Sequence, residues 1–281
     1  MLPFEIVDVF TDRAFAGNQL AVVYDGAELS TRQMQAVANE FGFSETSFVL
    51  PPTTGEADYR ARIFTPAEEL PFAGHPTIGS AVAAVASERV RPDGGTVVQE
   101  CEAGLMTIGL DGATAKLTST AIAVGEPVPV AVAARACGLD PSRVVGTPQT
   151  TSAGLPHNFV HLEDADVTAA TSHLGELELV YPFSFDRETR AVHGRLFHNS
   201  VGEDPATGSA AMALGVYLVE HGLIRGEGAH AYEIGQGAEM GRPSKLSGEV
   251  VVERGKAVAA SVTGSVAHVA RGELLTLPSE R

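Results

Sequence analysis

The chain has 281 residues, of which 44% are hydrophobic and 19% are charged, and its formal net charge is -16 at pH 7. This length is enough for two domains of ordinary size. The composition is that of a globular protein, and the acidity argues against nucleic acid or an anionic membrane surface as a partner. An anionic substrate therefore needs local attraction, for which helix N-termini, Arg62 and Arg242 are candidates.

Signals for targeting, disulfides and metal binding are missing from the sequence. The chain opens without a basic stretch followed by an apolar one and has no long uncharged apolar run, so we expect a cytoplasmic protein with no membrane partner. Cys101 and Cys137 stand far apart in unlike contexts, which predicts two free thiols. The nine histidines are scattered singly and neither CxxC nor HExxH occurs, so we expect no metal site.

The first half of the chain is predicted to form strands around one apolar helix. A hairpin of residues 5–10 and 18–24 precedes a helix that is capped by Ser30 or Thr31 and ends near Gly42. The helix after Pro76 is apolar nearly all round, which predicts that a curved sheet encloses it. The further strands expected in this half are residues 47–50, 59–64, 96–102, 105–110 and 113–119.

The second half repeats this pattern after a break. A run rich in Gly and Pro between about residues 121 and 130 predicts a linker between two domains, 1–122 and 123–281, with the last strand able to cross back to the first domain. An apolar helix is expected to start at Pro205 and end at His221-Gly222. The strands expected around it are residues 159–162, 177–182, 190–197, 229–234, 248–252, 257–262, 265–270 and 273–277.

Two Gly-rich turns, residues 72–81 and 203–211, are similar to each other and lead into the two Ala-rich helices. We expect Pro76 and Pro205 at the first helical position, with a Gly-Ser-Ala run following each at the same spacing. Small residues there leave the first-turn N–H groups open. If the two helix starts face one another, they form a cleft suited to a small carboxylate.

One carboxylate, Glu45, lies in an otherwise aromatic and aliphatic stretch, residues 41–50. An apolar setting raises the pKa of a carboxyl group, which makes a glutamate useful as a proton shuttle near neutral pH. The alternative interpretation is a surface glutamate at the start of a strand. The stretch by itself does not decide between the two.

Three polar residues belong to the two turns. His75 follows Gly74 in the first turn, Asp204 precedes the second helix, and Ser209 lies one turn inside it. Groups that donate or accept protons on both sides of a Gly-lined cleft suit reversible proton transfer at carbon. His75 has the alternative of a turn residue, Asp204 that of a helix N-cap, and Ser209 that of a small helix residue.

Other reaction classes have little support in the sequence. The glycines at 235, 237 and 241 do not have the Gly-x-Gly-x-x-Gly spacing, and there is neither a Walker loop nor a Gly-x-Ser-x-Gly elbow. Lysine occurs only three times, never in a context typical of a Schiff base. We therefore expect acid and base chemistry without a cofactor.

Several ordered motifs resemble one family over nearly the whole chain. They are VDVFT at 7–11, GNQLAVV at 17–23, SETSFVL at 44–50, RIFTP at 62–66, ELPFAGHP at 69–76, EDPATGSAA at 203–211 and QGAEMGRPS at 236–244. The chain resembles the PhzF isomerase family of phenazine biosynthesis, whose fold is similar to that of diaminopimelate epimerase. The resemblance implies an α+β protein of two pseudo-symmetric domains, each a curved, mostly antiparallel sheet around a central helix.

The resemblance also implies which residues act. The proton-shuttling carboxylate falls at Glu45, with His75, Asp204 and Ser209 around it in a cleft between the domains. Gly74 and Gly208 would hold the substrate carboxylate through their amides, and Asn18 is expected to bind substrate. A dihydro-hydroxyanthranilate is the family's archetypal substrate, and a homodimer is expected.

The related epimerases use two thiols, which by motif alignment would fall near Ala73 and Pro205. Cys101 and Cys137 therefore cannot take that role.

Specificity is expected in two less regular segments, 151–159 and 193–199, where His157 is either a substrate contact or a strand-edge histidine. Three functions remain open: an isomerase that uses Glu45, an epimerase or racemase with Asp204 as the second base, and a protein that binds a small carboxylate or a protein partner without catalysis.

Overall fold

The computed structural model describes residues 1–279 and divides into two compact units. Unit 1 comprises Met1–Leu117 and the chain from Gly264 onward, and unit 2 comprises Thr118–Thr263. Each unit is described by itself. Among residues 1–279, no helix is long and apolar enough to cross a bilayer.

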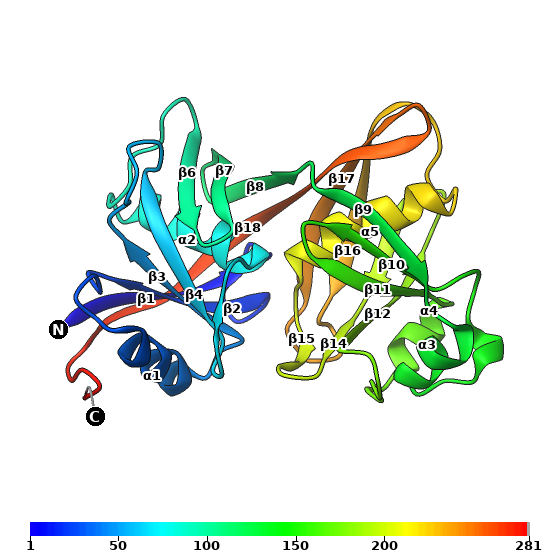
Figure 1. Ribbon diagram of the computed structural model, residues 1–281, viewed down its shortest axis with the longest axis horizontal. Helices are drawn as coiled ribbons and strands as arrows, with labels where there is room; N and C mark the ends of the chain where they lie inside the picture. The colour runs from blue at the N-terminus through cyan, green and yellow to red at the C-terminus, as the bar shows by residue number, and fades with distance from the viewer. Residues whose placement is uncertain (280–281) are drawn as a thin grey trace. The chain divides into compact units, whose positions relative to one another are not determined.

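Unit 1 consists of strands around the helix α2, as the left part of Figure 1 shows. Its elements in chain order are β1 (Leu2–Val9), β2 (Asn18–Tyr24), α1 (Thr31–Phe41), β3 (Glu45–Leu50), β4 (Tyr59–Phe64), β5 (Glu69–Leu70), α2 (Gly74–Ala86), β6 (Thr96–Cys101), β7 (Gly104–Asp111), the start of β8 (Thr114–Ser119) and the second part of β18 (Lys256–Leu274).

Unit 2 is built in the same way around the helix α5. Its elements are β9 (Ile122–Pro127), α3 (Val130–Ala136), the short 3-10 helix η1 (Pro141–Arg143), β10 (Gln149–Ala153), β11 (Pro156–His161), α4 (Asp164–Ala169), β12 (Leu179–Phe185), β13 (Ala191–Gly194), β14 (Leu196–His198), β15 (Gly202–Asp204), α5 (Gly208–Glu220), β16 (Gly228–Gln236), β17 (Ser244–Glu253) and the first part of β18.

The two units share one chain path. In unit 1 the antiparallel hairpin β1–β2 leads through α1 to β3, which is parallel to β2; β4 is antiparallel to β3, and α2 leads on to β6, parallel to β4. In unit 2 the hairpin β10–β11 leads through α4 to the parallel β12, and α5 leads from β15 to β16, which pairs in parallel with β13. The pairs β1–β18, β6–β7, β7–β8, β9–β10, β16–β17 and β17–β18 are antiparallel. This repeat confirms the predicted α+β fold with two similar halves.

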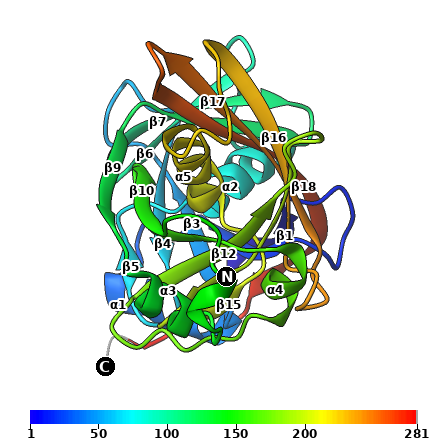
Figure 2. The same ribbon diagram turned by 90° about the vertical axis from the view of Figure 1, so that its right-hand side faces the viewer.

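The central helices are apolar all round because strands cover them on several sides. In α2, residues 74–84 are all buried, and the helix contacts β1, β2, β3, β4, β6 and β7. In α5, residues 208–218 are all buried, and the helix contacts β9, β10, β11 and β17. Figure 2 shows α5 among the strands labelled β9, β10 and β17. The prediction that a sheet encloses each apolar helix is confirmed.

The expected boundaries of α1 and of the end of α5 are also confirmed. Ser30 caps α1, and its hydroxyl and the Gln33 side chain form a reciprocal capping box. Gly42 ends the helix with φ 64°, a left-handed conformation that a glycine adopts without strain. The helix α5 ends at His221, which Gly222 follows with φ 61°.

The predicted linker is wrong, because residues 122–127 form a strand. β9 pairs antiparallel with β10, and the register shifts between Gln149 and Thr151. The Gln149 amide donates to the Gly125 carbonyl at 2.9 Å. The prolines and glycine of this run therefore belong to an irregular strand pair and do not mark a free connection.

The three strands expected at the C-terminal end are wrong as well, because residues 256–274 form the single strand β18. A Cβ atom at Gly264 would lie 2.2 Å from the Phe10 ring, and one at Gly272 would lie 2.8 Å from the Phe4 ring. Both glycines therefore allow close approach of a neighbouring aromatic ring within an extended strand.

Two short helices and one hairpin were not predicted. The helices α3 and α4 have only seven and six residues, too few for a helical period to stand out. The segment 151–159, expected to be irregular, belongs to the hairpin β10–β11, whose turn contains Gly154 with φ 111°. The segment expected as one strand at 190–197 forms β13 and the start of β14, which Arg195 separates.

We expect Gly248→Ala to lower the stability of unit 2. Gly248 pairs across strands with Tyr232, and an added Cβ would lie 2.1 Å from the Tyr232 ring. The ring cannot move freely, because its hydroxyl donates to the Ala211 carbonyl at 2.7 Å. We expect a loss of about 1–3 kcal/mol in the free energy of unfolding, measured by urea denaturation.

Gly109→Ala is the matched control for this strand substitution. The nearest atom to a Cβ added at Gly109 is 3.9 Å away, so its stability should stay the same or rise slightly. Equal losses in the two variants would show that backbone preference, and not the contact with Tyr232, governs the effect.

Candidate functional site

The central helices of the two units begin in the same way. Each has 13 residues and starts with a glycine, Gly74 in α2 and Gly208 in α5. Neither N-cap residue, Ala73 or Thr207, makes a side-chain capping hydrogen bond. Main-chain N–H groups at an uncapped helix start, together with the helix dipole, favour an anion. Both helix starts therefore have the features expected of a carboxylate site.

The two helices begin at other residues than the sequence suggested, so that Gly74 and not Gly79 corresponds to Gly208. Pro76 is the third residue of α2, and Pro205 lies three residues before α5, so neither is at the first helical position. Gly79 lies inside α2 and does not correspond to Gly208. A Cβ at Gly79 would lie 2.5 Å from Leu20, which explains a glycine there by packing.

In unit 1 the second residue of α2, His75, lies beside Glu45, the first residue of β3. The His75 Nδ1 atom is 3.4 Å from the Glu45 Oε2 atom, and the two side chains are 5% and 15% exposed. Glu45 Oε2 is buried and has no hydrogen-bond partner among residues 1–279. A carboxylate oxygen in that state is unusual, because buried polar atoms are nearly always hydrogen-bonded.

The hydrogen bonds of His75 decide where its proton lies. The Nε2 atom is 3.3 Å from the Gln19 carbonyl oxygen, which can only accept, so Nε2 carries a proton. The Asn18 Nδ2 atom is 3.4 Å from Nδ1, and the Asn18 Oδ1 atom accepts from the Ser44 hydroxyl at 3.1 Å. In the neutral ring, Nδ1 thus carries no proton and lies beside the Glu45 carboxyl group.

Burial changes the acidity of Glu45. Desolvation raises the pKa of Glu45 from 4.5 to about 7, and a hydrogen bond from Ser44 acts in the opposite direction. A group with a pKa near the working pH is present both as an acid and as a base. The geometry of unit 1 thus supports proton transfer by Glu45, with His75 as its neighbour.

In unit 2 the second residue of α5, Ser209, pairs with a histidine. The Ser209 Oγ atom is 3.0 Å from the His157 Nε2 atom, and the His157 Nδ1 atom is 2.7 Å from the Pro156 carbonyl oxygen. Both side chains are buried, His157 at 4% exposure and Ser209 at 7%. Desolvation, with His198 nearby, lowers the pKa of His157 to about 3, so the ring is neutral at physiological pH.

Asp204 is buried but is not the cap of α5. It ends β15, three residues before the N-cap Thr207, whose hydroxyl donates to the Asp204 Oδ2 atom at 2.5 Å. The Gln236 amide donates to the Asp204 carbonyl at 2.8 Å and to the Thr207 hydroxyl at 3.1 Å. The capping interpretation is therefore wrong, because Asp204 stabilises the turn that leads into α5.

The predicted site residues thus form two clusters, one in each unit. Unit 1 brings together Asn18, Glu45, Gly74 and His75, and unit 2 brings together His157, Asp204, Gly208 and Ser209. Asn18 begins β2 and His157 is the second residue of β11, the equivalent hairpin strand. In each unit, the start of the second hairpin strand supplies a polar partner for the second residue of the central helix.

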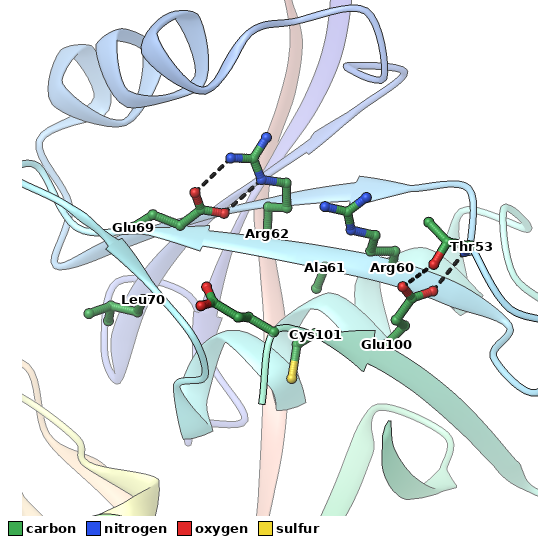
Figure 3. A pocket seen from close by; sticks show the side chains of 9 residues that line it. Thr53, Arg60, Ala61, Arg62, Glu69, Leu70, Glu100 and Cys101 are labelled. Atoms are coloured by element: carbon green, nitrogen blue, oxygen red, sulfur yellow. Dashed lines mark hydrogen bonds and ion pairs between the residues drawn. The ribbon is translucent and has the colours of Figure 1, made fainter. Parts of the chain in front are cut away.

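Arg62 does not serve as a free cation for an anionic substrate. It forms a bidentate ion pair with Glu69, in which both N–O distances are 2.6 Å. Figure 3 shows this pair in a pocket of about 460 Å³ in unit 1, with Arg60 between it and the hydrogen-bonded Thr53 and Glu100. Within this pocket the Arg62 charge is thus paired with Glu69, and Glu100 accepts hydrogen bonds from Thr53. Arg242, the other candidate, is half-buried in the turn after β16.

Sequence reasoning missed the residues that hold the two clusters in place. They are Ser44, the carbonyl groups of Gln19 and Pro156, Thr207 and Gln236. Ser44, Thr207 and Gln236 lie within the family motifs, so their membership of a motif could have marked them as site residues. Serine, threonine and glutamine are by themselves too common to do so. The carbonyl groups carried none, because every residue has one.

No group of three or more His, Cys, Asp or Glu side chains within residues 1–279 is arranged to hold a metal ion. Cys101 and Cys137 are both buried and free, as expected. Burial raises the pKa of both thiols, to about 12 for Cys137. Neither thiol belongs to the two clusters.

Comparison with known proteins identifies the class of enzyme. The chain is 36% identical to an uncharacterized isomerase of Mesorhizobium japonicum, with 96% of this chain and 97% of the relative covered. It is 32% identical to the trans-2,3-dihydro-3-hydroxyanthranilate isomerase of Pseudomonas fluorescens, with 97% and 99% covered. The protein is therefore an isomerase.

The family follows from a model that matches residues 7–272, described as phenazine biosynthesis-like protein. The crystal structure of a PhzF-family phenazine biosynthesis protein from Bacillus anthracis is similar, with a TM-score of 0.85, 25% identity, and 98% of this chain and 99% of that one covered. The chain belongs to the PhzC-PhzF family, which confirms the resemblance read from the motifs.

We expect Glu45→Gln to stabilise the protein at alkaline pH. Burial raises the pKa of Glu45 to about 7 in the folded chain, from an ordinary value of 4.5. Between these values the folded state keeps a proton that the unfolded state has lost, so stability falls as pH rises. The variant should gain up to about 3 kcal/mol in unfolding free energy at about pH 8 and nothing at about pH 4.

Urea denaturation at the two pH values measures this effect. Glu68→Gln is the control, because Glu68 is an exposed acid on the same unit, and its stability should change little at either pH. A gain in Glu45→Gln that does not depend on pH would contradict a raised pKa.

Proposed function

We propose that this isomerase moves a proton between two carbons of a small unsaturated carboxylic acid, with Glu45 as the single acid and base. The observation that carries the proposal is the buried Glu45 Oε2 atom, which has no hydrogen bond among residues 1–279 and lies 3.4 Å from His75 Nδ1. An oxygen that the protein leaves without a hydrogen bond is available to a substrate C–H group. The raised pKa, about 7, suits both directions of transfer.

In the first step, the ionised Glu45 removes a proton from a carbon next to an unsaturated or carboxyl-bearing group. The electron pair of the broken C–H bond delocalises into that group, and the neutral carboxyl group of Glu45 lies beside the acceptor atom His75 Nδ1. In the second step, Glu45 returns the proton to another carbon and is again a carboxylate. The reaction needs no cofactor, because proton and electron pair both stay with substrate and enzyme.

The helix starts of α2 and α5 are proposed to hold the substrate. The amides of Gly74 and Gly208, which precede uncapped first turns, would bind the carboxylate and the charge that develops on it. Asn18, His157, Asp204 and Ser209 would position polar substituents. The proposal has the substrate bound between the two halves of the chain, 1–122 and 123–281, which close over it and exclude water.

A dihydro-hydroxyanthranilate-type acid is the proposed substrate class. One relative is named for acting on trans-2,3-dihydro-3-hydroxyanthranilate, and it matches this chain along nearly its whole length. Such an acid has a carboxylate for the main-chain amides of the helix starts and an unsaturated ring for proton transfer by Glu45. It also has polar substituents for the polar side chains of the two clusters. The homodimer and the cytoplasmic location that the sequence predicts remain predictions.

Epimerisation would require a second base, for which Asp204 is the candidate. β12, the counterpart of β3, has no carboxylate in its sequence. The Oδ2 atom of Asp204 already accepts from Thr207 at 2.5 Å. A single buried glutamate therefore supports transfer of one proton from carbon to carbon better than exchange between two faces of one carbon.

The test is proton exchange in deuterated water. The protein is incubated with trans-2,3-dihydro-3-hydroxyanthranilate and a panel of cyclic and acyclic unsaturated acids, and deuterium at carbon is followed by NMR. Glu45→Gln should lose exchange by a factor of about 10² to 10⁴, the usual contribution of a positioned acid or base.

Glu68→Gln serves again as the exposed control and should exchange like the wild type. Exchange that survives in Glu45→Gln would exclude Glu45 as the base. Inversion at the original carbon, without transfer to another, would favour the epimerase and Asp204.

A further inference from the structure

The hydrogen bonds of the buried pair His157 and Ser209 determine where their protons lie. The His157 Nδ1 atom is 2.7 Å from the Pro156 carbonyl oxygen. A carbonyl has no proton to give, so the proton of this hydrogen bond belongs to Nδ1. A neutral imidazole has only one N–H, and Nε2 is therefore an acceptor.

The state of His157 fixes the state of Ser209. The Nε2 atom lies 3.0 Å from Ser209 Oγ, and because Nε2 can only accept, the Ser209 hydroxyl donates to it. The hydroxyl has one hydrogen, so Ser209 Oγ keeps only its lone pairs for any other partner. In an isolated serine the hydroxyl would rotate to suit either a donor or an acceptor.

We infer that His157 is a positioning residue that makes Ser209 Oγ an obligatory acceptor, and that Ser209 therefore selects a substrate with a hydroxyl or amino donor. A carboxylate, which only accepts, would repel the lone pairs of Ser209 Oγ. The substrate carboxylate must then bind at the main-chain amides of the helix starts. This inference rests on the proposed function in taking Ser209 as part of the site.

Unit 1 has a pair of contacting side chains at the same place as His157 and Ser209 in unit 2. Asn18, at the start of β2, contacts the second residue of α2, as His157, at the start of β11, contacts the second residue of α5. In both units one ring nitrogen of the histidine is held by a main-chain carbonyl, Gln19 in one and Pro156 in the other. The second residue of each central helix thus has a side-chain partner from the equivalent strand. In unit 1 the histidine is on the helix, and in unit 2 it is on the strand.

The same geometry does not make Ser209 a nucleophile. A catalytic serine needs a base that takes its proton near neutral pH and a group that stabilises the resulting imidazolium. Burial holds the pKa of His157 at about 3, and its Nδ1 atom faces a neutral carbonyl instead of a carboxylate. The pair therefore orients a hydroxyl and does not ionise it.

The first test concerns the ring itself and requires no substrate. In ¹⁵N NMR of the histidine side chains, the His157 signals are assigned as those missing from His157→Gln. We expect the Nδ1–H tautomer, with no titration between about pH 5 and pH 8. An Nε2–H tautomer, or titration in that range, would overturn the inference whatever the reaction of the enzyme.

The second test compares two stable aromatic acids, anthranilate and 2-methoxybenzoate, which carry at the same ring position an amino donor and an ether oxygen that only accepts. Wild-type protein should bind anthranilate about five- to tenfold more tightly by calorimetry, the usual worth of one hydrogen bond. His157→Gln keeps an acceptor for the Ser209 hydroxyl and should keep the preference. His157→Leu removes the acceptor and should reduce the preference to within about twofold, because Ser209 then serves either kind of group.

The outcomes separate this inference from the proposed reaction. Absence of a preference for anthranilate in the wild type, with or without binding, would overturn the assignment of a donor-bearing substrate. So would a preference that persists unchanged in His157→Leu. Proton exchange by Glu45 is measured independently, so its failure leaves the tautomer and the binding preference to be judged by their own results.

Discussion

A main-chain carbonyl that accepts one ring N–H from a buried histidine is the interaction on which both candidate clusters depend. The Gln19 carbonyl holds Nε2 of His75, and the Pro156 carbonyl holds Nδ1 of His157. Each carbonyl belongs to a strand of the sheet and accepts but cannot donate, so it fixes which nitrogen carries the proton. The second nitrogen of each ring then faces the side chain proposed to act, Glu45 or Ser209.

The repeated chain path explains why these groups meet. In each unit a hairpin, a helix, several further strands and an enclosed helix follow in the same order. The second hairpin strand and the central helix begin near one another in both. The helix must be apolar because strands cover it, and the polar residues that it carries are therefore concentrated at its start. The two units therefore have similar backbones at these places, but the side chains differ: His75 and Asn18 in unit 1 correspond to Ser209 and His157 in unit 2.

The acidity of Glu45 has an energetic consequence for the fold. A carboxyl group that keeps its proton up to about pH 7 opposes folding at higher pH, since the unfolded chain ionises more readily. Burial destabilises the ionised form of Glu45. This one effect lowers the free energy of unfolding at higher pH and raises the pKa of Glu45 to about 7, which suits its proposed role as base and acid. The proposed function of Glu45 and the stability of the fold are therefore opposed at this residue.

The sequence by itself determined the family, the α+β class and the identity of most candidate residues, because ordered motifs and two wholly apolar helices are local signals. It misjudged residues 122–127, which it predicted as part of a linker, and residues 256–274, most of which it predicted as separate strands. Gly264 and Gly272 are required by the rings of Phe10 and Phe4, contacts that only the folded sheet creates. Likewise, the sequence leaves open whether Asp204 caps a helix, and in the structure Thr207 is the N-cap and its hydroxyl donates to Asp204. Only the tertiary structure decided the proton positions of His75 and His157, because main-chain carbonyl groups fix them and no residue letter records where a carbonyl points.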